Sequence, residues 1–148
     1  MRSLIFSLLA TVLLIGCSSD ETSTTNVDFM VVSSGWNATT SYDELASFVI
    51  NSEEQYLNFL NSNLGVPVVE IADVDYTNYT LLAVVDKTRP DNSYGATIYK
   101  VYETPSTVEV VVKLTKHDGM ATQQPVAPYC IAKVNKINKQ VNWQYINE

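Results

Sequence analysis

The sequence is poor in the residues that carry most enzymatic and metal chemistry. It has one histidine and two cysteines among 148 residues, and the cysteines do not form a C-x-x-C pair. One histidine cannot build a His-rich zinc site. The sequence also contains no G-x-S-x-G nucleophile motif, no phosphate-binding P-loop and no H-E-x-x-H motif. We therefore expect a protein that is not an enzyme and that binds no metal or cofactor.

Two groups of residues offer the best alternatives to that expectation. Glu70, Asp73 and Asp75 carry oxygen ligands suited to calcium, but they lack the glycine and the regular spacing of a calcium-binding loop. His117 and Asp118 could polarise a water molecule. They precede Gly119 in a turn-forming sequence, where a solvated loop tip is the simpler interpretation.

Positive charge is absent from a long central stretch of the sequence. Between Cys17 and Asp86 there are eleven Asp and Glu residues and no Lys or Arg, whereas from Lys87 onward there are eight basic and five acidic residues. Nucleic acids and anionic lipids attract cationic proteins, so charge favours neither as a partner. The asymmetry leaves two interpretations open: solvated charge on opposite elements, or a two-faced molecule that orients a partner.

The sequence also lacks an apolar run long enough to span a membrane. Its mainly apolar stretch from Leu4 to Ile15 follows the positive charge of Arg2. As a helix this stretch would be about 18 Å long, whereas a bilayer core of about 30 Å needs roughly 20 apolar residues. A charged start, a short apolar middle and a small residue at Gly16 are typical of a secretory signal peptide.

The residues Leu14, Ile15, Gly16 and Cys17 resemble the lipobox of bacterial lipoproteins. The resemblance implies that the Cys17 thiol carries a diacylglyceryl group, that the chain is cut before Cys17, and that the new amine receives a fatty acyl chain such as palmitate. Two or more acyl chains hold a protein stably on a membrane. Residues 18–21 resemble the acidic sorting tag of some Gram-negative lipoproteins, which implies an outer-membrane location on the surface or periplasmic face.

Three segments follow from this pattern. Residues 1–16 form the expected lipoprotein signal peptide, residues 17–26 an expected flexible tether, and residues 27–148 a single globular domain. With Cys17 lipidated, Cys130 has no intramolecular partner. Its apolar neighbours favour a buried, inert thiol.

Periodicity predicts one helix among several strands. Ser52 and Gln55 form a capping box before apolar residues at helical spacing, so we expect a helix over residues 52–64 that ends at Gly65 and Pro67. Strands are expected at residues 29–32, 45–50, 81–85, 96–103, 107–115, 129–134 and 141–146, with turns at 33–35 and 118–119. The strand that starts at Leu81 has no polar alternation, which indicates burial on both faces.

These elements predict an α+β, mainly β fold. The connections between the late strands are short, which favours antiparallel pairing. We expect a mostly antiparallel sheet or sandwich of about six to seven strands, with one helix near residues 52–64 packed on it.

Four stretches together resemble one family. They are residues 49–56 at the start of the helix, residues 74–85 up to the buried strand, residues 89–98 around an Arg-Pro-Asp-Asn-Ser-Tyr turn, and the Pro-Tyr pair at 128–129. Their order and spacing resemble the C-terminal domain of the protease-complex subunit PrcB, common in bacterial lipoproteins, over roughly residues 49 to 146. That family usually has Gly-Gly where this chain has Asn92 and Ser93. Asn tolerates left-handed backbone, and Ser does so less readily.

The resemblance implies a non-enzymatic interaction module: a membrane-anchored lipoprotein that helps to assemble, retain or stabilise a surface protease. The expected partner is therefore a protein such as a secreted protease, and not a nucleic acid. Two alternatives stay open, a protease inhibitor that presents loops from a β-sandwich, and a small-ligand or glycan binder suggested by the Tyr and Trp content. The candidate contact residues are Arg89, Asn92, Tyr94, Gln123, Pro128 and Tyr129, for which turn geometry and strand packing are the alternative roles.

Overall fold

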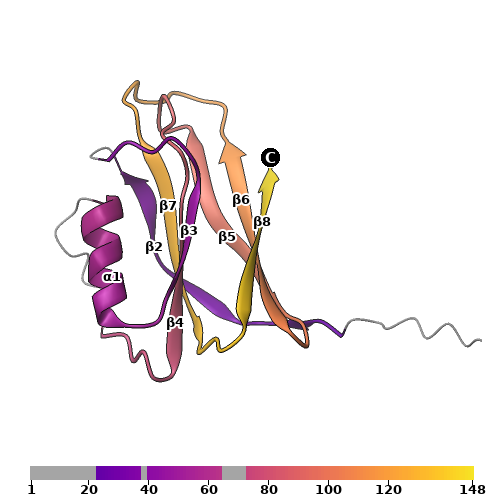
Figure 1. The fold of residues 1–148 in the computed structure, drawn as a ribbon. Coiled ribbons are helices and arrows are strands. Elements are labelled where there is room, and N and C mark those ends of the chain that lie inside the picture. Colours follow the sequence, from indigo (N-terminus) through magenta and orange to yellow (C-terminus); the bar gives the residue numbers. More distant parts are fainter. Residues whose placement is uncertain (1–22, 38–39, 65–72) are drawn as a thin grey trace, which may run out of the picture.

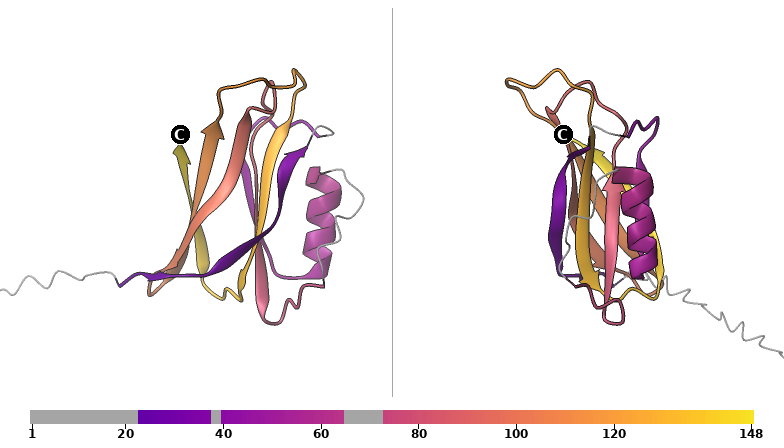
Figure 2. Two further views of the ribbon diagram at one scale, coloured as in Figure 1. Left: turned by 180° about the vertical axis from the view of Figure 1, so that it is seen from behind. Right: turned by 90° about the vertical axis from the view of Figure 1, so that its left-hand side faces the viewer.

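Two four-stranded sheets lie face to face, and one helix covers the outer face of one of them (Figure 1). The computed structural model describes residues 23–37, 40–64 and 73–148. The predicted α+β, mainly β class is confirmed, although the described residues form eight strands rather than six to seven. The left view in Figure 2, seen from behind, shows the three layers side by side: sheet, sheet and helix.

The first sheet, which we call the β5–β6 sheet, has the order β1-β5-β6-β8. β5 pairs antiparallel with β1 and β6, but β8 runs parallel to β6. The parallel pair arises because the chain crosses to the other sheet as β7 between these two strands. The four strands are β1 (Thr25–Asn26), β5 (Tyr94–Glu103), β6 (Thr107–Lys116) and β8 (Gln140–Asn147).

The second sheet, which we call the β4–β7 sheet, has the order β2-β7-β4-β3 and is antiparallel throughout. β4 and β7 form its centre, and β2 and β3 form its edges. These strands are β2 (Phe29–Asn37), β3 (Ala46–Ile50), β4 (Tyr79–Val85) and β7 (Ala127–Asn135).

Residues 81–85 of β4 are buried on both faces, as their unbroken apolar sequence predicts. Leu82 and Val84 point into the core between the sheets, with side chains from β5, β6 and β7. Leu81, Ala83 and Val85 belong to the second apolar cluster, under the helix. All five side chains are fully buried. Because side chains alternate along a strand, a strand between two apolar layers must be apolar at every position.

The helix α1 (Glu53–Phe59) begins where the capping box predicts. The Ser52 hydroxyl accepts a hydrogen bond from the Gln55 backbone N–H at 3.2 Å, and the Gln55 side-chain oxygen accepts one from the Asn51 N–H at 2.7 Å. The chain continues as the π-helical turn η1 (Leu60–Leu64) and buries its apolar side against the β4–β7 sheet. The predicted end at Gly65 and Pro67 lies outside the described residues.

One predicted turn is wrong. The sequence predicts a strand over residues 29–32 and a turn at residues 33–35, but β2 runs unbroken to Asn37. Pairing with β7 keeps this polar, glycine-containing stretch extended, and a shift in register between Val31 and Ser33 absorbs the irregularity. The pairing partner is distant in sequence, so the local pattern did not contain it.

Two residues of the expected tether belong to the sheet. Thr25 and Asn26, assigned to the tether, form β1 against Glu103 and Tyr102 of β5. The Val27 backbone N–H then donates to the Val101 carbonyl at 2.9 Å. Backbone pairing needs no apolar side chain, which explains why a polar sequence gave no signal for it.

Candidate functional site

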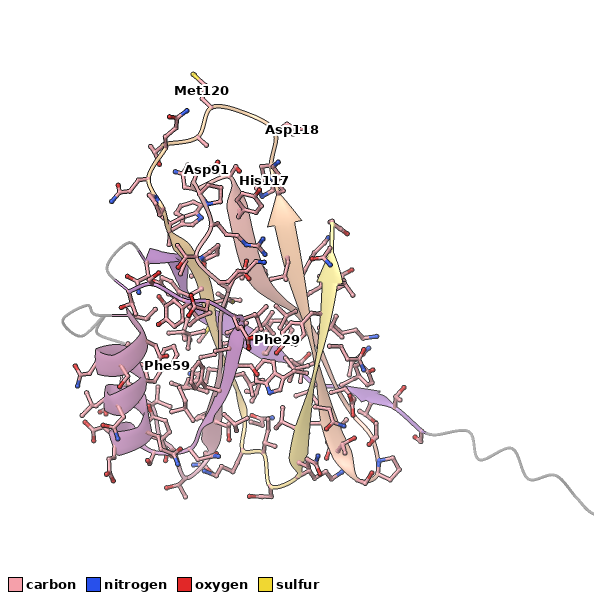
Figure 3. The ribbon with its side chains drawn as sticks, turned by 45° about the horizontal axis from the view of Figure 1, so that its top comes forward. Phe29, Phe59, Asp91, His117, Asp118 and Met120 are labelled. Atoms are coloured by element: carbon pink, nitrogen blue, oxygen red, sulfur yellow. The ribbon has the colours of Figure 1, made fainter. Side chains whose placement is uncertain are left out.

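Two loops meet at one end of the sandwich and form the candidate functional site. Residues 86–93 join β4 to β5, and residues 117–126 join β6 to β7. The backbones of Arg89 and Val126 exchange two hydrogen bonds, of 2.7 and 2.9 Å, which tie the loops together. We call these two loops the loop end; Asp91, His117, Asp118 and Met120 mark it in Figure 3.

A side chain, rather than left-handed backbone, holds the turn before Tyr94. The Asp91 carboxylate accepts hydrogen bonds from the Ser93 hydroxyl at 2.5 Å and from the Ser93 backbone N–H at 2.8 Å. These bonds hold the pKa of Asp91 below its usual range. No non-glycine residue of the described chain has a positive φ, so neither Asn92 nor Ser93 adopts left-handed backbone. The Asn92 side-chain oxygen instead accepts a hydrogen bond from the Thr122 backbone N–H at 2.9 Å.

Tyr94 stands at the centre of an aromatic and cationic cluster. The Arg89 guanidinium lies 4.9 Å from the centre of the Tyr94 ring, and the Lys116 ammonium lies 5.6 Å from it. The indole N–H of Trp36, from β2, donates to the Tyr94 carbonyl at 2.7 Å and so joins the two sheets at this end. Trp36 still leaves 53% of its surface exposed. We call Trp36, Arg89, Tyr94 and Lys116 the Tyr94 cluster.

Arg89 also has a structural role. Asp86, at the end of β4, is only 1% exposed, and its carboxylate accepts a hydrogen bond from the Arg89 Nε at 2.6 Å. The same carboxylate accepts the backbone N–H of Lys87 at 2.8 Å. A buried carboxylate requires such partners, because isolating its charge from water is costly. Arg89 therefore fixes the loop and orients its guanidinium at the Tyr94 ring.

The structure brings together some of the sequence-predicted contact residues and separates others. Arg89, Asn92 and Tyr94 lie together at the loop end, half-buried, and Gln123 is exposed on the second loop. Pro128 is buried in β7, so its side chain is not available to a partner. Tyr129, the sixth candidate, packs in the apolar cluster under the helix, and its hydroxyl lies 3.3 Å from the hydroxyl of Ser33. For Pro128 and Tyr129 strand packing is the role that the structure gives.

Sequence reasoning missed Trp36 and Lys116. Trp36 follows Gly35 in a stretch that reads as a turn, and Lys116 ends a predicted strand with no local mark of function. Only the pairing of β2 with β7 and of β5 with β6 places both side chains beside Tyr94. The one signal in the sequence was an isolated tryptophan in a polar segment.

Among the described residues, the carboxylates considered for a metal site do not come together, and His117 and Asp118 lie apart from them at the loop end. Asp75 is used in a turn, where it accepts hydrogen bonds from the Thr77 N–H at 2.9 Å and the Asn78 amide at 2.7 Å. These bonds lower the pKa of Asp75. Glu70 lies outside the described residues, and among the described ones no three His, Cys, Asp or Glu side chains cluster. His117 and Asp118 are exposed at the loop end.

Cys130 is the buried thiol that the sequence predicts. It lies in β7 in the core between the two sheets and has no exposed surface. Burial raises the pKa of its thiol. A protonated, inaccessible thiol is a poor nucleophile.

Comparison of the chain with family models, curated proteins and solved structures found no match. The described helix is too short to cross a bilayer, and no other described segment forms a membrane-spanning helix.

Proposed function

We propose that this protein is a lipid-anchored, non-enzymatic interaction module that presents the loop end to a protein partner. The Tyr94 cluster carries the proposal. It combines a half-exposed tryptophan and tyrosine with two cations, and protein interfaces are enriched in Trp, Tyr and Arg. The Arg89–Val126 backbone bonds, the Arg89–Asp86 pair and the bond from Trp36 to the Tyr94 carbonyl hold three of these residues in place before a partner arrives, which lowers the entropic cost of binding.

The position of β1 supports an anchored orientation. β1 pairs with Tyr102 and Glu103 at the end of β5, whereas Tyr94 begins β5. Eight residues of strand separate Tyr94 from Tyr102, or about 26 Å. β1, the first described strand, therefore lies at the opposite end of the sandwich from the loop end (Figure 1). A lipid on Cys17 would leave the loop end facing away from the membrane.

The proposed partner class is a protease that works at the cell surface, as the family resemblance implies. In this role the module would assemble, retain or stabilise the protease. Two adjacent loops at the end of a rigid sandwich also suit a protease inhibitor. Addition of the full chain to papain-like and subtilisin-like proteases separates these two roles, because an inhibitor lowers turnover with increasing dose and an assembly factor does not.

The partner proposal is tested by cross-linking and capture from cells that express the tagged full chain. Tyr94→Ala and Trp36→Ala should each reduce recovery of a specific partner by about tenfold. Tyr99→Ala is the matched control, because Tyr99 is 59% exposed on β5 but lies outside the cluster. Equal capture by all three variants, with unchanged thermal stability, would remove the loop end as the binding surface.

The anchor is tested separately. Cys17→Ala should abolish incorporation of labelled palmitate and release the protein from the membrane fraction, because the acyl chains supply the membrane affinity. Cys130→Ala changes the other cysteine, which is buried, and should leave the protein membrane-bound. Membrane retention of the Cys17→Ala variant would contradict lipidation as the cause of anchoring.

A further inference from the structure

A second surface lies on the helix side of the molecule, at the edge of the β4–β7 sheet. β3 pairs with β4 along one side, and within the described ranges no strand pairs with its other side. An edge strand presents unpaired backbone N–H and C=O groups, which can accept a further strand. β3 carries no Pro and no charged side chain that would block such an addition.

A groove lies between this edge strand and the helix α1. The groove has a volume of about 480 Å³ and is lined by residues 47–50 of β3 and by Gln55, Asn58, Phe59, Ser62 and Asn63 of the helix and its π-turn. The rings of Phe48 and Phe59 meet edge to face with centroids 5.0 Å apart, which gives the groove an apolar floor. The groove therefore pairs an apolar floor with an open strand edge.

The helix wall of the groove offers polar groups to a bound backbone. The side chains of Asn58 and Ser62 make no hydrogen bond within the part of the chain that the structure describes. A side-chain amide both donates and accepts. The far end of the groove is fixed, because the Tyr42 hydroxyl and the Asn37 amide both donate to the Asn63 carbonyl.

The charged side chains around the groove are acidic, which favours a basic occupant. Asp43 and Glu44 precede β3, and Glu53 and Glu54 begin α1; all four are exposed. The chain has no Lys or Arg between Cys17 and Asp86, so neither wall of the groove carries a cation. Lys87, just beyond β4, is the first Lys or Arg after Cys17. An extended segment that carries Lys or Arg would be attracted here, and an acidic one repelled.

We propose that the groove between β3 and α1 binds an extended, basic segment of a partner protein, which adds to the β4–β7 sheet as a fifth strand beside β3. Strand addition of this kind takes its affinity from backbone hydrogen bonds and its specificity from pockets for alternate side chains. Five residues of β3 can pair with a segment about 17 Å long. The inference is independent of the loop end, since the two surfaces share no residue.

The probe for this site is a labelled, end-blocked heptapeptide, Lys-Val-Thr-Val-Thr-Val-Lys. Its binding to the full chain in detergent is measured by fluorescence anisotropy. We expect saturable binding that weakens with added salt. We also expect slower amide hydrogen exchange within residues 46–50 when the peptide is bound. A peptide with Glu in place of both Lys, and one with Pro in place of the central Val, should bind at least about tenfold more weakly.

Matched variants locate the site. Asn58→Trp fills the groove and should raise the Kd by about tenfold, whereas Asn61→Trp makes the same change on an exposed helix position outside the groove and should leave it unchanged. Failure of the basic peptide to bind, equal binding of the acidic peptide, or equal affinity of both variants would overturn the proposal. Concentration-dependent dimerisation abolished by Asn58→Trp would assign the edge to a second copy and also overturn it. Partner capture that depends on Tyr94 but not on Asn58 would leave the loop-end proposal standing.

Discussion

At the scale of single residues, the Arg89 side chain both stabilises the fold and forms part of the candidate binding surface. Arg89 pairs with a buried carboxylate at 2.6 Å and at the same time lies over the Tyr94 ring. The sequence predicted Arg89 as a contact residue. It could not predict that Arg89 pairs with a buried Asp86, because the burial of Asp86 results from the packing of β4. A loss of binding on mutation of Arg89 would therefore need a stability measurement beside it.

The Arg89→Ala variant should be less stable by about 3 kcal/mol, because it leaves the Asp86 carboxylate buried without its cationic partner. Chemical denaturation of the two proteins measures the difference. Lys113→Ala is the control: Lys113 pairs with the exposed carboxylate of Glu148, and such surface pairs contribute about 0–1 kcal/mol. Asp86→Asn combined with Arg89→Ala should cost less than Arg89→Ala alone. Equal stability of Arg89→Ala and the parent protein would mean that water or another group solvates Asp86.

At the scale of elements, local signals predicted the helix start and most strands, and failed where pairing overrides them. The capping box at Ser52 is a local contact between neighbours, so the sequence contains all of it. The extended path of β2 through Ser33 and Gly35 depends instead on β7, about a hundred residues later. The parallel β6–β8 pair likewise depends on a crossover that no short window can contain.

The Ser52→Ala variant should lower the free energy of unfolding by about 1 kcal/mol, because the N–H of Gln55 loses its hydrogen-bond acceptor at the helix start. Thermal or urea unfolding measures this change. Ser106→Ala, in the exposed turn between β5 and β6, removes a hydroxyl that makes no hydrogen bond in the described structure and should be nearly neutral. Equal effects of the two substitutions would show that the cap does not stabilise α1 in solution.

At the scale of the whole molecule, three layers share β4 and β7 as a common centre. One apolar cluster fills the space between the sheets and another lies under the helix. Tyr42 and Tyr56 belong to the helix layer, and burial raises the pKa of each phenol to about 12. The helix layer therefore favours the protonated phenols, and its integrity depends on pH in the alkaline range.

The protein should lose stability between about pH 10 and pH 12. The unfolded phenols ionise near pH 10, whereas the folded ones ionise near 12, so the contribution is complete below pH 10 and falls as the pH rises toward 12. Urea unfolding at stepped pH, followed by phenolate absorbance, measures this dependence. A double variant, Tyr42→Phe with Tyr56→Phe, should show a shallower decline. A flat stability profile across this range in the parent protein would contradict burial of these hydroxyls.

The sequence by itself determined the fold class, the helix start and the doubly buried β4, because each follows from spacing between neighbouring residues. It also predicted the turn around Asp91 and three of the residues that meet at the loop end, Arg89, Asn92 and Tyr94. Only the tertiary structure added Trp36 and Lys116 to that site and removed Pro128 and Tyr129 from it. It also formed the groove between β3 and α1. The physical reason is that both sites are formed by residues from strands that are far apart in the chain. The register in which those strands pair is set by the packing of the whole core.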